Sequence, residues 1–241
     1  MKLKKIASLM LAGVMAASML AGCQNTSVNP DPAPNPDPTP STGYSSMLED
    51  KMSVQVTNKT VFRDDADLNA ALDYAVGNVG HDDITADFVY GALNGGAVRF
   101  ISNNGDANDP LRMVVSTMRD KLDVKADWND EDTDTLDNIR PSDADPDAYN
   151  YYTKKNVNTL LVYVVDDGDK IPNALDQIKN SIQSTWEDDL YDDFQVTGQQ
   201  NSGRDYHYDC SVAVSNRNFE SGHGIGVNFI AVEVTRVDGN K

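Results

Sequence analysis

The chain has 241 residues, with 20 Lys and Arg against 38 Asp and Glu, and a formal charge of −18 at pH 7. Beyond residue 23 the balance is 17 against 38, which gives a formal charge of −21. So acidic a chain lacks the clustered cations that bind nucleic-acid phosphates, and an anionic membrane surface would repel it. A hydrophobic share of 39% is enough for a core, which argues against wholesale disorder.

The first 23 residues have the composition of an export signal. Three lysines lie among the first five residues, and the 17 residues from Ile6 to Gly22 carry no charge. That run is shorter than the stretch of about twenty residues that a bilayer-spanning helix needs. It closes with Leu20-Ala21-Gly22-Cys23, which resembles the lipobox of bacterial lipoproteins.

The resemblance implies cleavage before Cys23 and a diacylglyceryl group on its sulfur. Two acyl chains hold a protein stably at a membrane, so no transmembrane helix would be needed. We therefore expect residues 1–22 to be a signal peptide and the mature protein to be held at the cell membrane, facing away from the cytoplasm. The alternatives are an uncleaved membrane helix and an ordinary secretory signal with a chance cysteine.

A proline-rich segment follows the cysteine. Residues 29–40 read Asn-Pro-Asp-Pro-Ala-Pro and then Asn-Pro-Asp-Pro-Thr-Pro, and they contain six of the ten prolines. Alternating proline favours polyproline II, in which twelve residues extend about 37 Å at about 3.1 Å each. We expect residues 23–44 to be a lipidated N-terminus and a spacer. A proline-rich ligand for a recognition domain is the alternative.

Residues 45–241 are expected to form one acidic domain, which begins with a strand and a helix. Residues 52–62 contain valines in alternation, which favours an edge strand. Asp64 and Asp65 then supply a cap for a helix with a single buried stripe. The apolar positions of that stripe are Leu68, Ala71, Leu72, Ala75, Val76 and Val79.

Two more helices are expected before the middle of the chain. The first runs over residues 83–93 and is stopped by Gly95-Gly96, and residues 97–101 are a candidate strand. The second begins at Asp109-Pro110, because Asp is a good N-cap and Pro fits the first helical position. Its stripe consists of Leu111, Val114, Val115, Met118 and Leu122.

The C-terminal half is predicted to be richer in strands. Residues 157–165 are apolar on both alternating faces, as in a central strand covered on each side. A turn at residues 166–169 leads into a helix of about five turns with Leu175, Ile178, Ile182 and Trp186 on one face. Three further strands are expected at Phe194–Gln199, Tyr206–Ser215 and Ile225–Val237. N-terminal helices followed by a largely antiparallel sheet, in the order strand, helix, strand, strand, strand, indicate the α+β class.

One candidate site combines a thiol with histidines. His207, Cys210 and His223 fall close together in the sequence, which suggests either a metal site or a cysteine nucleophile with a histidine base. On a strand, however, His207 and Cys210 point to opposite faces, so they cannot share a metal ion without a bulge. Apolar neighbours on the Cys210 face favour a packed, protonated thiol. The pair Cys210 and His223 is the catalytic alternative.

The other candidate site is acidic. Asp127–Asp147 holds nine carboxylates, and Asp130, Asp132 and Asp134 have the spacing that opens a calcium-binding EF-hand loop. The Gly and the bidentate Glu of that loop are absent, so the segment is no EF-hand. Closely spaced carboxylates remain candidate Ca²⁺ ligands, against the alternative of a solvated acidic loop. A second set of this kind ends the predicted central strand: Asp166, Asp167 and Asp169.

The common signatures of catalysis are missing from the sequence. It has no Gly-rich phosphate loop, no Gly-x-Ser-x-Gly elbow and no His-Glu-x-x-His helix. We therefore expect a membrane-anchored, non-enzymatic module that binds an envelope polymer, peptide or protein, with Ca²⁺ as the one candidate cofactor and no nucleic-acid partner. The alternative function is a cell-envelope hydrolase that uses Cys210 and His223.

Overall fold

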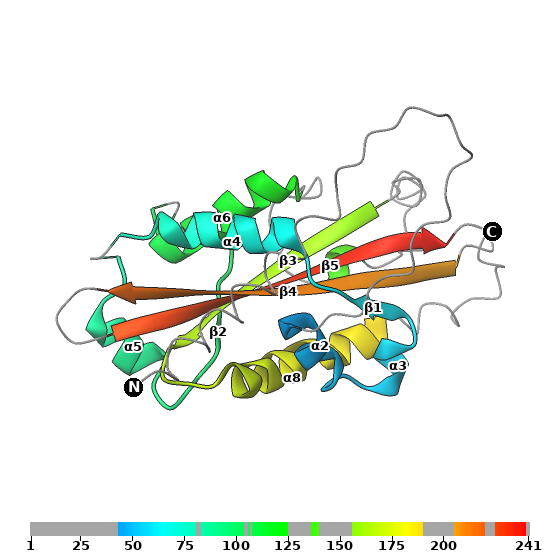
Figure 1. Cartoon of the computed structure of the whole chain (residues 1–241), viewed down its shortest axis with the longest axis horizontal. Coiled ribbons are helices and arrows are strands. Elements are labelled where there is room, and N and C mark those ends of the chain that lie inside the picture. Colours follow the sequence, from blue (N-terminus) through cyan, green and yellow to red (C-terminus); the bar gives the residue numbers. More distant parts are fainter. Residues whose placement is uncertain are drawn as a thin grey trace, which may run out of the picture. The chain divides into compact units, whose positions relative to one another are not determined.

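The fold is α+β, with a five-stranded, mostly antiparallel sheet between two layers of helices (Figure 1). The computed structural model describes residues 43–80, 83–103, 106, 108–124, 136–139, 156–189, 205–219 and 225–239. All of them belong to one compact unit, Pro38–Lys241. The helices are α2 (Tyr44–Glu49), α3 (Val54–Thr57), α4 (Ala66–Gly77), α5 (Ala86–Ala92), α6 (Pro110–Leu122), the 3-10 helix η1 (Leu136–Ile139) and α8 (Ile171–Asp189). The strands are β1 (Thr60–Phe62), β2 (Arg99–Phe100), β3 (Asn156–Asp166), β4 (Asp205–Phe219) and β5 (Ile225–Gly239).

Three long strands form the centre of the sheet. The strand order is β1-β4-β5-β3-β2, so β5 is central and pairs antiparallel with β4 on one side and β3 on the other. The short strands close the edges: β1 runs parallel to β4, and β2 runs antiparallel to β3. The prediction of helices followed by a largely antiparallel sheet is confirmed. The expected strand at 194–199 lies outside the described residues.

The alternation of side chains divides the core into two layers. Val162, Ala213 and Ala231 point to one face, which is covered by α4, α5 and α6 and is called the α4–α6 layer below. Val212 and Val232 point to the other face, which is covered by α2, α3, η1 and α8 and is called the α8 layer. Figure 1 shows α4 and α6 on one side of the strands and α8 with α2 on the other. Because both faces of the sheet are covered, β3 is apolar at consecutive positions, as its sequence predicts.

The caps of α4 and α6 are those the sequence predicts. The Asp65 carboxylate accepts hydrogen bonds from Asp67 N at 2.7 Å and Leu68 N at 3.0 Å, which satisfies two free N–H groups of the first turn. The Asp109 carboxylate accepts from Leu111 N at 3.0 Å, with Pro110 at the first helical position. The predicted apolar stripes of α4 and α6 lie in the core of the α4–α6 layer.

The predicted strand over 52–62 is wrong for most of its length. Residues 54–57 form the short helix α3, because the Ser53 hydroxyl caps it by accepting from Val56 N at 3.4 Å. Val56 is fully buried while Val54 is 74% exposed, so one valine anchors the turn and the other faces solvent. Only residues 60–62 pair with the sheet, and they do form an edge strand. Helix α2, which precedes this segment, was not predicted.

The segment after α5 is shaped by two glycines. Helix α5 begins at Ala86 with Thr85 as its cap, three residues after the predicted start, and Gly95 and Gly96 follow it at φ values of 74° and 76°. That left-handed region is open to glycine and costly for most residues. Gln177 of α8 holds this turn, donating to Gly96 O at 2.7 Å and accepting from Val98 N at 3.2 Å.

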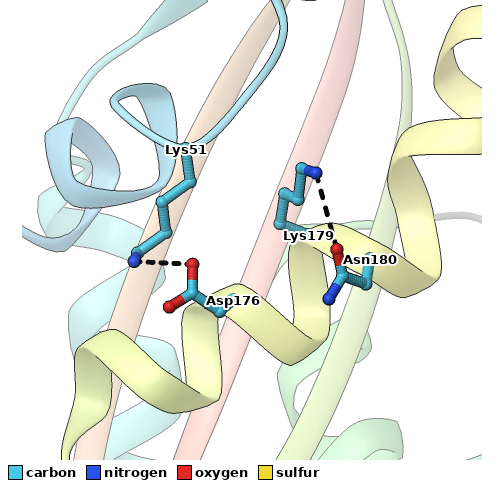
Figure 2. A network of polar contacts seen from close by, with 4 residues as sticks. All are labelled: Lys51, Asp176, Lys179 and Asn180. Atoms are coloured by element: carbon cyan, nitrogen blue, oxygen red, sulfur yellow. Dashed lines mark hydrogen bonds and ion pairs between the residues drawn. The ribbon is translucent and has the colours of Figure 1, made fainter.

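The N-terminal helices are joined to both the sheet and α8. Ser45 on α2 is fully buried, and its hydroxyl accepts a hydrogen bond from Val212 N of β4 at 2.9 Å. Lys51, which follows α2, donates to Asp176 of α8 at 2.8 Å, and Lys179 lies one turn further along α8 beside Asn180 (Figure 2). The first residues described therefore belong to the α8 layer and lie at the β1 edge of the sheet.

Candidate functional site

Cys210 lies where the alternation of β4 places it, inside the α8 layer. Its side chain has no exposed surface, and its neighbours along the same face of β4 are Tyr208 and Val212. Burial raises the pKa of the Cys210 thiol far above its ordinary value, and the negative charges of Glu233 and Glu49 add to this effect. A thiol in this environment stays protonated at neutral pH and is a poor nucleophile.

The histidines do not join Cys210 within the described part of the chain. His207 belongs to the alternate set of β4 positions that face the α4–α6 layer, so it points away from Cys210 as predicted. His223 lies outside the described residues, and the pair Cys210 and His223 stays a prediction. Burial of the thiol is the observation that weighs against it.

The predicted lipidation and calcium residues are not covered by the described ranges. Cys23 lies outside them, and so do Asp130, Asp132 and Asp134. Part of the same acidic stretch is described, because Leu136 and Ile139 in η1 are buried in the α8 layer. The carbonyl of Ile139 accepts a hydrogen bond at 3.0 Å from the buried guanidinium of Arg236.

The second acidic set, after β3, forms a structured turn. Asp166 accepts from Gly168 N at 2.8 Å, and Asp169 accepts from the Asn173 amide at 3.2 Å. The pKa of Asp167 is raised by desolvation first, then by a hydrogen bond and charge repulsion from Asp166. Within the described ranges, no three His, Cys, Asp or Glu side chains are grouped so that they could hold a metal ion.

An open hollow lies between α4 and α6, where the first turn of one helix meets the last turn of the other. Its volume is about 450 Å³, within the range typical of ligand sites. Five residues line it: Asp67, Ala70, Ala71, Lys121 and Leu122. The helices pack against each other through their buried stripes, and two of the three residues that α4 contributes to the hollow are alanines.

The helical spacing of α4 explains which of its residues face the hollow. Ala70 and Ala71 lie three and four positions after Asp67, and Tyr74 lies four and three positions after them, so these residues form a stripe next to the buried one. Ala71 belongs to both stripes, being buried in the core and part of the hollow. Asp67 and Tyr74 are exposed and lie about two turns apart.

On the α6 side, Lys121 provides a positive charge beside an aromatic ring. Its Nζ lies 3.8 Å from the centroid of the Tyr74 ring, which is close enough for a cation–π interaction. Lys121 is in the last turn of α6 and Asp67 in the first turn of α4, so each charge also opposes the partial charge of its own helix end. The lining of the hollow thus contains one negative residue, Asp67, and one positive residue, Lys121, which do not form an ion pair with each other.

The negative charge of Asp67 also acts on Glu233 in the sheet. Glu233 of β5 faces the α4–α6 layer and accepts from the Asn158 amide at 3.0 Å. Its pKa is raised mainly by desolvation, and the charges of Asp65 and Asp67 raise it further. Additional negative charge near Asp65 and Asp67 is therefore unfavourable.

The sequence did not identify this site. The sequence predicts Ala71 and Leu122 as members of the buried stripes of α4 and α6, and it predicts no role for Asp67, Ala70 and Lys121. The available signal is the exposed Ala70 beside the buried Ala71 on α4, together with a lysine in the last turn of α6. These residues can be recognised as one site only when the packing of α4 against α6, in antiparallel orientation, is known.

The fold places the chain among α+β domains with a sheet between two helical layers. Comparison with known proteins adds no further assignment, since no family model matches the chain and no curated protein or solved structure does either. None of the helices in the described ranges has both the length and the apolar character needed to cross a membrane.

Proposed function

We propose that the protein is a lipid-anchored bacterial lipoprotein displayed outside the cytoplasm, whose α+β domain binds an envelope polymer, peptide or protein without catalysing a reaction. The observation that carries the proposal is the open hollow between α4 and α6, whose lining includes Asp67 and Lys121. An open site with one charge of each sign is suited to recognition of a polar ligand.

The sequence supports the anchoring part of the proposal. A charged start, an apolar run and Cys23 occur in the order of a lipoprotein signal. The proline repeat at 29–40 follows, and its extended length of about 37 Å would hold the domain away from the lipid surface. Two acyl chains on Cys23 would be sufficient for stable attachment.

The burial of Cys210 favours binding over hydrolysis. A cysteine nucleophile needs an accessible thiolate, and this thiol is buried among apolar side chains with its pKa raised.

Anchoring is tested by replacing Cys23 with Ala in the full-length protein in cells. We expect Cys23→Ala to be released into the medium or to accumulate as an unprocessed precursor, measured by fractionation and intact mass. Cys210→Ala removes the other cysteine and should leave the protein in the membrane fraction. Retention of Cys23→Ala in the membrane at the normal mature mass would refute the anchor.

Binding is tested by sedimentation of the purified mature protein with isolated cell envelopes. The double variant D67N/K121Q should reduce the bound fraction, because it removes both charges of the hollow without changing the net charge. D73N/K179Q is the matched control: Asp73 lies elsewhere on α4 and Lys179 on the opposite layer of helices (Figure 2). Equal sedimentation of all three proteins would refute a binding function for this hollow.

A further inference from the structure

Asp67 and Lys121, the two charged residues of the hollow, do not form an ion pair with each other. Two ion pairs of the described residues, Lys51 with Asp176 and Arg63 with Asp209, involve neither charged residue of the hollow. The contact that the structure gives the Lys121 ammonium is with the Tyr74 ring. The Asp67 backbone N–H donates to the Asp65 carboxylate in the cap of α4, and the Asp67 residue is exposed.

Besides the two charged residues, the hollow is lined by three apolar ones. Ala70 and Ala71 form the α4 wall and Leu122 adds apolar surface on the α6 side. A ligand with a bulky apolar body would have to displace Lys121 from the Tyr74 ring. A compact ligand with a short chain between two polar ends would cover the alanines and leave that contact intact.

We propose that the hollow binds a zwitterionic ligand, namely an amino acid or short peptide that presents an ammonium group to Asp67 and a carboxylate to Lys121. This inference deepens the proposed binding function and rests on it. Charge complementarity selects this class over the others: an anion would meet the Asp67 carboxylate, and a cation would meet the Lys121 ammonium. Tyr74 acts as a positioning residue, since its ring contacts the ammonium of Lys121, which lines the hollow.

Three probes of nearly equal size separate the charge classes. Glycylglycine has both charges, N-acetylglycylglycine has only the carboxylate, and glycylglycine amide has only the ammonium. Each is titrated into the full mature protein while the methyl resonances of Ala70, Ala71 and Leu122 are followed by NMR. We expect glycylglycine to shift these resonances with an affinity about two- to fivefold higher than that of either blocked probe, because each exposed ion pair contributes modestly.

Charge variants test whether the order of affinities for the three probes is set by Asp67 and Lys121. In D67K both charged residues of the hollow are positive, and N-acetylglycylglycine should become the preferred probe. In K121D both are negative, and glycylglycine amide should become the preferred probe. D73K on the same helix should keep the wild-type ranking. Melting temperatures of the variants confirm that the comparison is made on folded protein.

The outcomes distinguish this inference from the proposed function. Equal affinity for the three probes, a ranking that does not follow the charges, or no shift at the hollow would overturn the zwitterion assignment. If envelope sedimentation still depends on Asp67 and Lys121 in that case, the binding function stands and only the ligand class is wrong. Loss of both results would overturn the function as well.

Discussion

Replacement of Cys210 tests whether this residue is a packed core side chain or a reactive thiol. Its side chain is 0% exposed, and on β4 it is paired with Phe62 of β1 on one side and with Val234 of β5 on the other. Cys210→Ala removes one buried heavy atom, which should cost about 0.5–1.5 kcal/mol in free energy of unfolding. Cys210→Ser places a hydroxyl group in the same apolar surroundings, which should cost about 1–3 kcal/mol when the hydroxyl finds no partner.

These costs are measurable as melting temperatures. For a domain of this size each kcal/mol lowers the midpoint by about 2–4 °C, so Ala should lower it by about 1–6 °C and Ser by about 2–12 °C. Which of the two variants melts lower matters more than the size of either shift. A nucleophilic cysteine in a solvated site would tolerate Ser better than Ala, whereas a buried one should tolerate Ala better. Differential scanning calorimetry at pH 7 gives both numbers.

Thiol modification provides an independent assay of the same reasoning. In a Cys23→Ala background Cys210 is the only cysteine, because the sequence has two. Alkylation by iodoacetamide should then require opening of the α8 layer and should be about 10³-fold slower in buffer than in urea, given a stability of at least about 5 kcal/mol. Alkylation at comparable rates in the two solvents, together with Ser as stable as wild type, would refute the buried-thiol interpretation.

Three further predictions concern glycine, pH and calcium. Gly96→Ala should destabilise the fold more than Gly95→Ala: both adopt positive φ, but only at Gly96 does a new Cβ meet a side chain, at 2.9 Å from the Asp169 carboxylate. Equal melting temperatures of the two variants would contradict this. Stability should rise as pH falls from 7 towards about 5, because the raised pKa values of Glu233 and Asp167 mean that the folded state takes up protons first. Chemical denaturation of E233Q and D167N should show a flatter pH dependence, and an unchanged slope would count against the shifts. Finally, if the acidic stretch around Asp132 binds Ca²⁺, millimolar Ca²⁺ should raise the melting temperature more than NaCl of equal ionic strength does, and equal curves would leave it as solvated surface.

The long elements could be predicted from the sequence because each one buries a continuous stripe. Helix α8 and strand β3 carry patterns long enough for the period to be unambiguous. The face on which Cys210 lies follows from strict alternation along β4, without knowledge of its neighbours. The caps at Asp65 and Asp109 are local interactions between residues two and three positions apart, so the sequence contains all the information they need.

The short elements could not be predicted because tertiary contacts decide them. Val54 and Val56 alternate as in a strand, yet the Ser53 cap and burial of a single valine are sufficient for one helical turn. The hollow was missed for a different reason: Asp67 and Lys121 are more than fifty positions apart, and only the packing of α4 against α6 brings them to one site.

The place where the described domain begins affects how it would respond to mechanical load. Ser45 and β1 hold the first residues against the outer edge of β4, through the bond from Val212 N and the pairing of Thr60 with Tyr208. If the protein is anchored at Cys23 as proposed, tension along the chain that precedes the domain would reach this edge first. A parallel strand of three residues offers few hydrogen bonds in series with that force. Under tension the β1 edge should therefore yield before the β4–β5 hairpin, so that the N-terminal helices act as an extensible leader while the central strands and the α4–α6 hollow stay intact.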